Sequence, residues 1–448
     1  MKYVCFYAQE FQDFRIQELE SICGLFNIKL DINLHSYKVE KPYLLIDVKN
    51  LSDVEKILSR SILMKNISEL WGHGKTFEDI ASTSDWKTHS NDGTFKFEVD
   101  VFNKKITLSE RVGYIEEIQK YISIPGEVDL KNPSIIFNML LNFDNDQLDY
   151  IYFGKLVGYS QRNVIHQYNL KTRYFIGNTS MDPQLALLMA NQAQVKDGSF
   201  CYDPFVGTGS IIIACSHFGG LSGGSDIDYN IIYGRGKSSR AGNKNFRARD
   251  EIIRTNYDHY KLMDKYWDIM AGDATNIPFR VKELFDAIVT DPPYGIREGG
   301  RKLGSKKDTT WDIPEDIRDE HIPAKKHHNL SNIITDLLHF AFNYLVLGGR
   351  LVYWLPVYKP SYTEEMIPRH PGLELVGNCE QHLTKTVSRR MITMIKTKRL
   401  AECEASVAST HTDEWIQQQN DFRKNYFTGN PMNVKPDVPV IKIEKEAK

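Results

Sequence analysis

Cysteine is scarce in this chain of 448 residues, and its few positions lie far apart. No Cys-x-x-Cys pair occurs among the six, which are Cys5, Cys23, Cys201, Cys215, Cys379 and Cys403. Such scattered positions argue against a structural zinc site and against a disulfide framework. We therefore expect a protein of a reducing compartment, the cytoplasm, that holds no metal of its own.

Long apolar runs and a strong net charge are also missing. No apolar run in the sequence is long enough to span a bilayer. Gln9 and Glu10 interrupt the apolar start of the chain, which favours a first strand over a signal segment. The formal net charge is −2, so a polyanion would have to bind a local patch. The length of 448 residues is enough for two or three domains, and 25% charged with 41% hydrophobic residues is the usual composition of a soluble globular protein.

Residues 1–154 alternate between strand and helix patterns and contain no catalytic cluster. Strands are predicted at 3–7, 43–48 and 95–101, and helices at 11–26 and 110–121. This pattern favours an α+β module that recognises a partner. Residues 155–177 are expected to form a linker, in which Arg162, Lys171 and Arg173 alternate with tyrosines. Such a pattern suits either contact with unpaired nucleotides or packing between domains.

The first helix of the next domain is expected to begin at Asp182-Pro183, because aspartate is a favourable helix N-cap and proline fits the first turn. A short predicted strand at 200–202 is followed by the turn Asp203–Ser210 and by an apolar helix. A strand, a glycine-containing turn and a helix in this order open a doubly wound nucleotide-binding fold. Asp226 follows Gly207 by nineteen residues, about the distance at which a carboxylate holds a ribose diol.

The glycine turn departs from the Gly-x-Gly-x-x-Gly dinucleotide pattern because it starts with Asp203. A carboxylate there would repel a pyrophosphate but attract a sulfonium and an ammonium group, which favours S-adenosylmethionine over NAD. Asp273, in Gly272-Asp273-Ala274, ends a third predicted strand and is suited to accept a hydrogen bond from an adenine amine. All these turns are expected at the carboxyl ends of parallel strands, where open sheets bind ligands.

The stretch Asp291-Pro292-Pro293-Tyr294 follows a predicted buried strand at 285–290. Two prolines remove two backbone donors and restrict the backbone, so the chain must leave the sheet in a stiff turn. An exocyclic amine could donate hydrogen bonds to the Asp291 side chain and to the Pro292 carbonyl while Tyr294 stacks on the base. The alternative is an Asp-Pro turn that merely ends a strand.

From about Tyr174 to Lys396, the chain resembles class I S-adenosylmethionine-dependent methyltransferases that act on amines. Within them it most resembles the family of catalytic subunits of eukaryotic tRNA guanine-10 N2-methyltransferases. The segments that carry this resemblance are 178–182, 203–210, 291–298 and 350–356, and residues 95–101 and 128–133 are similar to the family's RNA-binding THUMP region. The resemblance implies an N-terminal α+β THUMP-type region at 1–154, a linker at 155–177, a Rossmann-like α/β methyltransferase domain at 178–399 and a charged tail at 400–448.

The resemblance also implies roles for individual residues. Asp291, Pro292, Pro293 and Tyr294 would hold and orient the guanine N2 of a tRNA. The residues implied in cofactor binding are Thr179, Asp203, Pro204, Phe205, Val206, Gly207, Thr208, Gly209, Asp226, Ile227, Asp273 and Ala274. The family further implies a small zinc-binding activator subunit as a partner, so that the zinc would belong to that partner.

Two basic segments flank these motifs. After the Asp291 turn come the candidate RNA-binding residues, which are Arg297, Arg301, Lys302, Lys306 and Lys307. They could bind tRNA phosphates, whereas a solvated loop is the alternative. The basic segment 233–254, after Asp226, is open to the same two interpretations. His327 and His328 are expected to be surface residues.

Two other functions are compatible with these motifs. One is an amino methyltransferase that acts on another RNA guanine or on DNA adenine, since the Asp-Pro-Pro-Tyr turn is widely shared. The other is a binding protein that has kept the fold without activity, against which the intact acidic residues at all four turns argue. The charged tail beyond Arg399 is expected to be partly disordered, and the alternative is that Trp415 and Phe422 dock a short helix.

Overall fold

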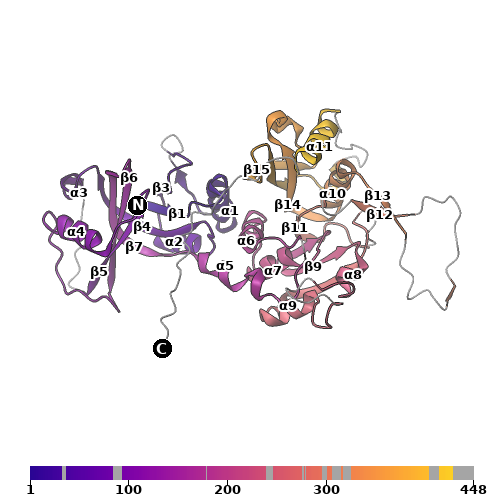
Figure 1. Ribbon diagram of the computed structural model, residues 1–448, viewed down its shortest axis with the longest axis horizontal. Coiled ribbons are helices and arrows are strands. Elements are labelled where there is room, and N and C mark those ends of the chain that lie inside the picture. Colours follow the sequence, from indigo (N-terminus) through magenta and orange to yellow (C-terminus); the bar gives the residue numbers. More distant parts are fainter. Residues whose placement is uncertain are drawn as a thin grey trace. The chain divides into compact units, whose positions relative to one another are not determined.

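The computed structural model describes residues 1–32, 37–83, 93–177, 179–238, 246–274, 277, 279–294, 300–304, 314–315, 324–402 and 413–426. The chain divides into two compact units, Met1–Val164 and Ile165–Lys448, each with a seven-stranded sheet (Figure 1). None of the helices that it describes combines the length and the apolar character that a bilayer crossing requires.

The sheet of the first unit has the strand order β2-β3-β1-β4-β7-β6-β5. Its neighbours are antiparallel except for β5 and β6, which are parallel. The strands are β1 (Lys2–Tyr7), β2 (Asp31–Ile32), β3 (Tyr43–Asp47), β4 (Met64–Gly74), β5 (Phe95–Phe102), β6 (Ile135–Asp144) and β7 (Gln147–Tyr159). The helices are α1 (Arg15–Phe26), α2 (Leu51–Leu58), α3 (Phe77–Thr83) and α4 (Leu108–Gln119). The predicted α+β pattern is confirmed, with α1 beginning as an α-helix a few residues later than expected.

An aromatic core covers one face of this sheet. Alternation along β5 turns Phe95 and Val99 into it, and β6 and β7 add Phe137 and Phe153. Ile80 of α3 and other helix residues close the core. The apolar pattern along the strands therefore accounts for this face of the first unit.

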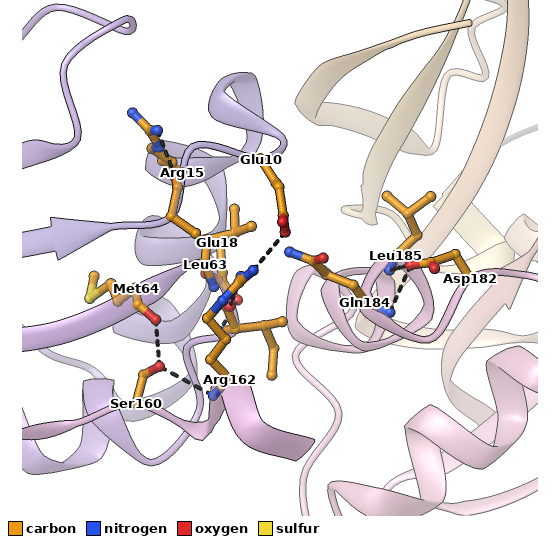
Figure 2. Close-up of polar contacts among 12 residues, drawn as sticks. Glu10, Arg15, Glu18, Leu63, Met64, Ser160, Arg162, Asp182, Gln184 and Leu185 are labelled. Atoms are coloured by element: carbon orange, nitrogen blue, oxygen red, sulfur yellow. Dashed lines mark hydrogen bonds and ion pairs between the residues drawn. The ribbon is translucent and has the colours of Figure 1, made fainter. Parts of the chain in front are cut away.

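Arg162 ties the end of β7 to the rest of the first unit. The Ser160 hydroxyl donates to the Met64 carbonyl at 2.5 Å and accepts from the Arg162 backbone N–H at 3.2 Å, and the Arg162 guanidinium pairs with Glu10 at 2.6 Å (Figure 2). Strand β7 continues past residue 155, where a linker was predicted to start. These contacts favour a packing role for Arg162 over contact with nucleotides.

A short helix, α5 (Val164–Gln167), follows, and Arg173 then packs inside the second unit. Arg173 is buried, and its guanidinium donates to the Ser210 hydroxyl at 2.6 Å and to the Tyr168 carbonyl at 3.1 Å. The basic residue is therefore used to hold the segment in place, which again favours the packing interpretation of residues 155–177.

The main sheet of the second unit has the strand order β10-β9-β8-β11-β14-β16-β15. The strands are β8 (Phe200–Asp203), β9 (Leu221–Asp226), β10 (Tyr266–Ala271), β11 (Phe285–Thr290), β14 (Leu345–Tyr358), β15 (Leu373–His382) and β16 (Val387–Lys396). The first five are parallel, and β15 and β16 form an antiparallel hairpin at one edge. Counted along the chain, the order is 3-2-1-4-5-7-6, a doubly wound sheet extended by a terminal hairpin.

Helices cover both faces of this sheet (Figure 1). They are α6 (Pro183–Gln192), α7 (Ser210–His217), α8 (Tyr229–Ile232), α9 (Ile253–His259), α10 (Leu330–Tyr344) and α11 (Asp413–Tyr426). On one face, Trp354 of β14 donates to the sulfur of Met189 in α6 at 3.2 Å. On the other face, alternation along β14 directs Leu351 and Tyr353 to the core that α10 shares.

The predicted start of α6 is confirmed. The Asp182 carboxylate accepts hydrogen bonds from the backbone N–H groups of Gln184 and Leu185, at 2.9 and 3.2 Å, and Pro183 occupies the first turn (Figure 2). Two of the otherwise unpaired N–H groups of the helix start are thereby satisfied.

Helix α11 docks on the second unit, which confirms the alternative that Trp415 and Phe422 offered for this part of the tail. The Gln418 side-chain amide pairs with both the N–H and the carbonyl of Tyr358 at the end of β14, at 2.6 and 2.9 Å. Trp415 belongs to the core of the second unit and Phe422 is fully buried. This part of the tail is therefore an integral layer of the fold.

Candidate functional site

The turns at the carboxyl ends of the parallel strands line one large cavity in the second unit, with a volume of about 940 Å³. Asp203 ends β8, Asp226 ends β9, Asp273 follows β10 and Asp291 follows β11, and all four line the cavity. Parallel neighbours end at the same edge of a sheet, so four motifs that are far apart in sequence meet in one place. The predicted convergence is confirmed.

Asp203 is buried at the floor of this cavity, with 1% of its surface exposed. Its Oδ1 accepts from the Phe205 backbone N–H at 2.9 Å and from the Thr290 hydroxyl at 2.5 Å. Burial raises the pKa of Asp203 to about 7, and the nearby Asp226 and Asp291 add to this rise, while the two hydrogen bonds oppose it. A carboxylate with such a pKa is stabilised in its charged form by a cation placed beside it.

Two glycines shape the turn after β8. Gly207 has a φ of 50° and Gly209 a φ of 80°, a backbone region that residues other than glycine rarely adopt. The Gly207 N–H donates to Asp226 Oδ2 at 2.9 Å, which links the first two strand ends. Gly209 does not line the cavity. A Cβ there would lie 2.8 Å from Ile253, so this glycine allows the start of α7 to pack closely against Ile253 of α9.

Asp273 connects the third strand end to a small hairpin, β12 (Arg301–Leu303) and β13 (Lys325–His327). The Leu303 backbone N–H donates to Asp273 Oδ2 at 2.7 Å. The hairpin thereby brings Arg301 to the wall of the cavity.

The Asp291 turn carries a compact polar cluster. The Tyr294 hydroxyl donates to Asp291 Oδ1, and Nη1 of Arg389 lies 3.3 Å from Asp291 Oδ2 and 3.2 Å from the Tyr294 oxygen. Burial, followed by the charge of Asp291, raises the pKa of Tyr294 well above its usual value. The Tyr294 ring meets Phe422 of α11 edge-on, with centroids 6.2 Å apart. Tyr294 is thus fixed from both ends.

Several residues of the cavity wall were not predicted from the sequence. Arg389 and Gln381 come from the terminal hairpin, and Tyr426 from α11. Strand alternation is the pattern in the sequence that could have indicated the direction of Arg389, because it places Arg389 on the same face of β16 as Met391. The chain offers no comparable local signal for Tyr426, because it lies in the charged tail.

The expectation that His328 is a surface residue is wrong. Its side chain is buried, and its Nε2 lies 2.7 Å from Asp336 Oδ2, with both residues lining the cavity. His328 lies two residues before α10, whose first turns line the cavity, and this packing could not be seen from the sequence. His327 is exposed, as expected.

Most of the other predicted residues line the same cavity. Those in its wall are Thr179, Pro204, Phe205, Val206, Gly207, Thr208, Ile227, Ala274, Pro292, Pro293, Tyr294 and Arg301. Lys302 does not line it. Arg297, Lys306 and Lys307 lie outside the described residues.

The basic segment after Asp226 contributes Arg235, Lys237 and Arg247 to the cavity wall. Arg247 donates to the backbone carbonyls of Asn230 and Arg235, at 3.3 and 3.1 Å, and therefore holds the described part of this segment in place. Within the described parts of the chain, no group of three or more histidine, cysteine or acidic side chains is arranged to hold a metal ion.

Two family models match the chain. One is described as the Tmrp11 THUMP N-terminal domain and matches residues 1–162, and the other is an RMKL-like methyltransferase domain that matches residues 171–219. Together with the sheet order and the four carboxylates at one sheet edge, these matches define a methyltransferase of the class I fold with a THUMP-type N-terminal region.

Curated relatives cover almost the whole chain. The tRNA (guanine(10)-N(2))-methyltransferase TRMT11 of Homo sapiens is 40% identical over 445 residues, which is 96% of this chain and 95% of the relative. The TRMT11 protein of Xenopus laevis is 40% identical over 96% of this chain and 91% of the relative. The TRMT11 protein of Dictyostelium discoideum is 35% identical over 88% of this chain and 82% of the relative. The chain belongs to the TRMT11 family of tRNA (guanine(10)-N(2))-methyltransferases.

Proposed function

We propose that this chain transfers a methyl group from S-adenosylmethionine to the exocyclic N2 of guanosine 10 in tRNA. The observation that carries the proposal is the meeting of the Asp291-Pro292-Pro293-Tyr294 turn with three further carboxylates around one cavity, in a member of the TRMT11 family. The family match of residues 1–162 to a THUMP N-terminal domain supports RNA as the substrate class.

The cavity residues fit S-adenosylmethionine. A Cβ added at Gly207 would meet no protein atom closer than 4.0 Å, so the glycine leaves space on the cavity side. Asp203 would face the cationic methionine part, Asp226 would accept from the ribose hydroxyls, and Asp273 would accept from the adenine amine. When bound, the cofactor supplies a methyl group on a positively charged sulfur.

The wall residues of this subsite are Thr179, Pro204, Phe205, Val206, Thr208, Ile227 and Ala274. Gly209 would act indirectly, by shaping the turn, since it does not line the cavity. A cavity of about 940 Å³ leaves room for a target base beside the cofactor.

The chain's contribution to the chemistry is mainly orientation. Guanine N2 is a weak nucleophile because its lone pair is delocalised into the ring. Hydrogen bonds to the Asp291 carboxylate and the Pro292 carbonyl would favour a pyramidal nitrogen and aim its lone pair at the methyl group. Fixing the reacting groups in line can contribute up to roughly 7–11 kcal/mol. Asp291 would accept the proton that the amine loses after methylation.

A guanine in a helical stem must leave its stack to reach this turn, at a cost of a few kcal/mol. The Tyr294 ring would stack on the extruded base and offset part of that cost. Its edge-on contact with Phe422 supports this role, because it holds the ring in one orientation.

A small zinc-binding activator subunit is proposed as the partner of this chain, and the cytoplasm as its location. The scattered cysteines support the location, and Cys5, Cys23 and Cys201 are buried thiols in the fold. The partner would supply the zinc.

Mass spectrometry of nucleosides after incubation of tRNA with the chain and S-adenosylmethionine tests the proposed function. We expect N2-methylguanosine at position 10, and a larger yield when the activator is present. A tRNA in which guanosine 10 is replaced by adenosine is the control. Methylation of a DNA adenine, or no methylation with or without the activator, would contradict the proposal.

Neutralising the basic residues after the Asp291 turn should weaken tRNA binding and reduce its dependence on salt. For Arg301, Lys302, Lys306 and Lys307 changed to alanine, the slope of log K against log salt should fall by about 0.7–0.9 for each phosphate that the variant no longer neutralises. Binding titrations at several salt concentrations measure this slope. Lys282→Ala, before the amino end of β11, is the control, and an unchanged slope in the fourfold variant would exclude the RNA-binding role.

A further inference from the structure

We propose that Arg389 of β16 is a positioning residue for methyl transfer, a role that rests on the proposed function of the Asp291 turn. One nitrogen of its guanidinium, Nη1, lies 3.3 Å from Asp291 Oδ2 and 3.2 Å from the Tyr294 oxygen. A single donor group therefore contacts both side chains that would handle the target base. Arg389 comes from the terminal hairpin, 98 residues along the chain from Asp291.

The rest of the Arg389 side chain is braced on three sides. Its Nε donates to Gln381 Oε1 of β15 at 2.6 Å, and its guanidinium carbon lies 4.1 Å from the centre of the Trp354 ring in β14. Its Nη2 lies 3.6 Å from the sulfur of Met181, just before α6. Arginine is planar and presents its donors in fixed directions, so a guanidinium held in this way also fixes the direction of each hydrogen bond.

This arrangement gives the Asp291 carboxylate one orientation. Tyr294 donates to Oδ1 and Arg389 contacts Oδ2, so rotation of the carboxylate would break both contacts. Because burial and Asp291 raise the pKa of Tyr294, its hydroxyl keeps the proton that it donates. A carboxylate has about four acceptor positions, so these two donors leave positions for an incoming amine.

The positive charge of Arg389 also balances the negative charge of Asp291 in a place with little solvent. The side chain of Arg389 is 13% exposed and that of Asp291 24%. Removal of one partner of such a pair leaves the other charge poorly compensated. We infer that the Asp291 turn depends on Arg389 for its shape as well as on its two prolines.

The next residue along β16 provides a matched control. Arg390 points to the opposite face of the strand, where it donates to Asn378 at 2.5 Å and to Glu380 at 3.3 Å and lies 4.6 Å from the centre of the Tyr362 ring. It has the same chemistry and a similar set of partners, with a side chain that is 15% exposed, and it does not line the cavity. Arg390→Met therefore reports the structural effect of losing a largely buried arginine from β16.

The experiment compares kcat and KM for tRNA, the Kd of S-adenosylmethionine, and Tm in the full chain with its activator. We expect Arg389→Met to lower kcat roughly 100-fold, the effect of a reacting group misplaced by about 1 Å, with cofactor Kd unchanged. Arg389→Lys keeps the charge but not the fork of donors, so its kcat should lie between those of wild type and Arg389→Met. Arg390→Met should keep kcat near wild type while it lowers Tm to a similar extent.

Equal losses of kcat in Arg389→Met and Arg390→Met, or a loss that parallels cofactor binding, would overturn the proposal. If Arg389→Met does not fold, Gln381→Met decides, since it removes the brace on Nε and keeps Arg389. A several-fold lower kcat with unchanged cofactor Kd is then expected, and an unchanged kcat would overturn the inference. These outcomes require an active wild-type chain. An inactive wild type would contradict the proposed function, and this inference with it.

Discussion

Asp291→Ala is expected to abolish methyl transfer while S-adenosylmethionine still binds. The substitution removes the acceptor that would orient the guanine amine and leaves the cofactor turn after β8 intact. It also removes the charge partner of Arg389 and the acceptor for the Tyr294 hydroxyl. A loss in kcat of about 100-fold or more is expected, because a slight misplacement of a reacting group already has an effect of that size.

Asp291→Asn separates the contribution of the acceptor oxygen from that of the negative charge. The amide keeps one acceptor oxygen and most of the shape, but it loses the negative charge opposite Arg389, so an intermediate kcat is expected. Asp286→Ala is the matched control. Asp286 lies on β11, the strand that leads into the Asp291 turn; it is exposed and accepts one hydrogen bond from the Phe200 N–H at 2.7 Å. Its loss should cost about 1 kcal/mol of stability and leave kcat unchanged. Full activity of Asp291→Ala would remove the proposed mechanism.

Asp203→Asn is expected to stabilise the cofactor-free protein above pH 7 and to weaken binding of S-adenosylmethionine. The folded-state pKa of Asp203 is about 7, raised by burial above the ordinary value of 3.8. Between these two pH values the folded state holds a proton that the unfolded state has released, so the free energy of unfolding falls as pH rises. The fall is on the order of 4 kcal/mol and is complete above pH 7.

Asparagine escapes this loss because it stays neutral, and its side-chain oxygen can still accept from Phe205 and Thr290. The difference in Tm between Asp203→Asn and wild type should therefore grow from about pH 4 to pH 7 and then stay constant. Thermal unfolding without cofactor, at a series of pH values, measures it. Asp197→Asn is the control with the opposite sign, since a hydrogen bond from Lys265 lowers the pKa of the exposed Asp197. A Tm difference for Asp203→Asn that does not change with pH would contradict the raised pKa.

The same variant should bind the cationic cofactor about 30-fold more weakly or worse, because loss of one partner of a buried charge pair costs about 2 kcal/mol or more. In the wild type, affinity should rise with pH up to about 7 as Asp203 ionises. Calorimetric titration of both proteins across this range tests the idea. Equal affinity in Asp203→Asn would show that the carboxylate does not face the cation. A buried acid that destabilises the empty protein is thus expected to favour the loaded one.

Much of this fold could be predicted from local patterns. The apolar run at 285–290 followed by two prolines predicted β11 and its end, and β11 spans these residues. The prediction of Asp182 as an N-cap was also correct, because a cap depends only on residues within one helical turn. Even the meeting of Asp203, Asp226, Asp273 and Asp291 followed from a general property of parallel sheets, once each turn was placed after a strand.

Other features depend on contacts between residues that are distant along the chain. Arg389 reaches Asp291 because β16 is inserted antiparallel beside β14, and Tyr426 reaches the cavity because α11 docks on the same unit. The raised pKa of Asp203 depends on how completely neighbouring strands cover it, and the burial of His328 on where α10 begins. Periodicity and turn residues therefore specified the strands, the turns and the chemistry that they carry. The packing of distant elements decided which charges face each other and how far they are removed from water, because Coulomb energies and desolvation depend on distance in space rather than along the chain.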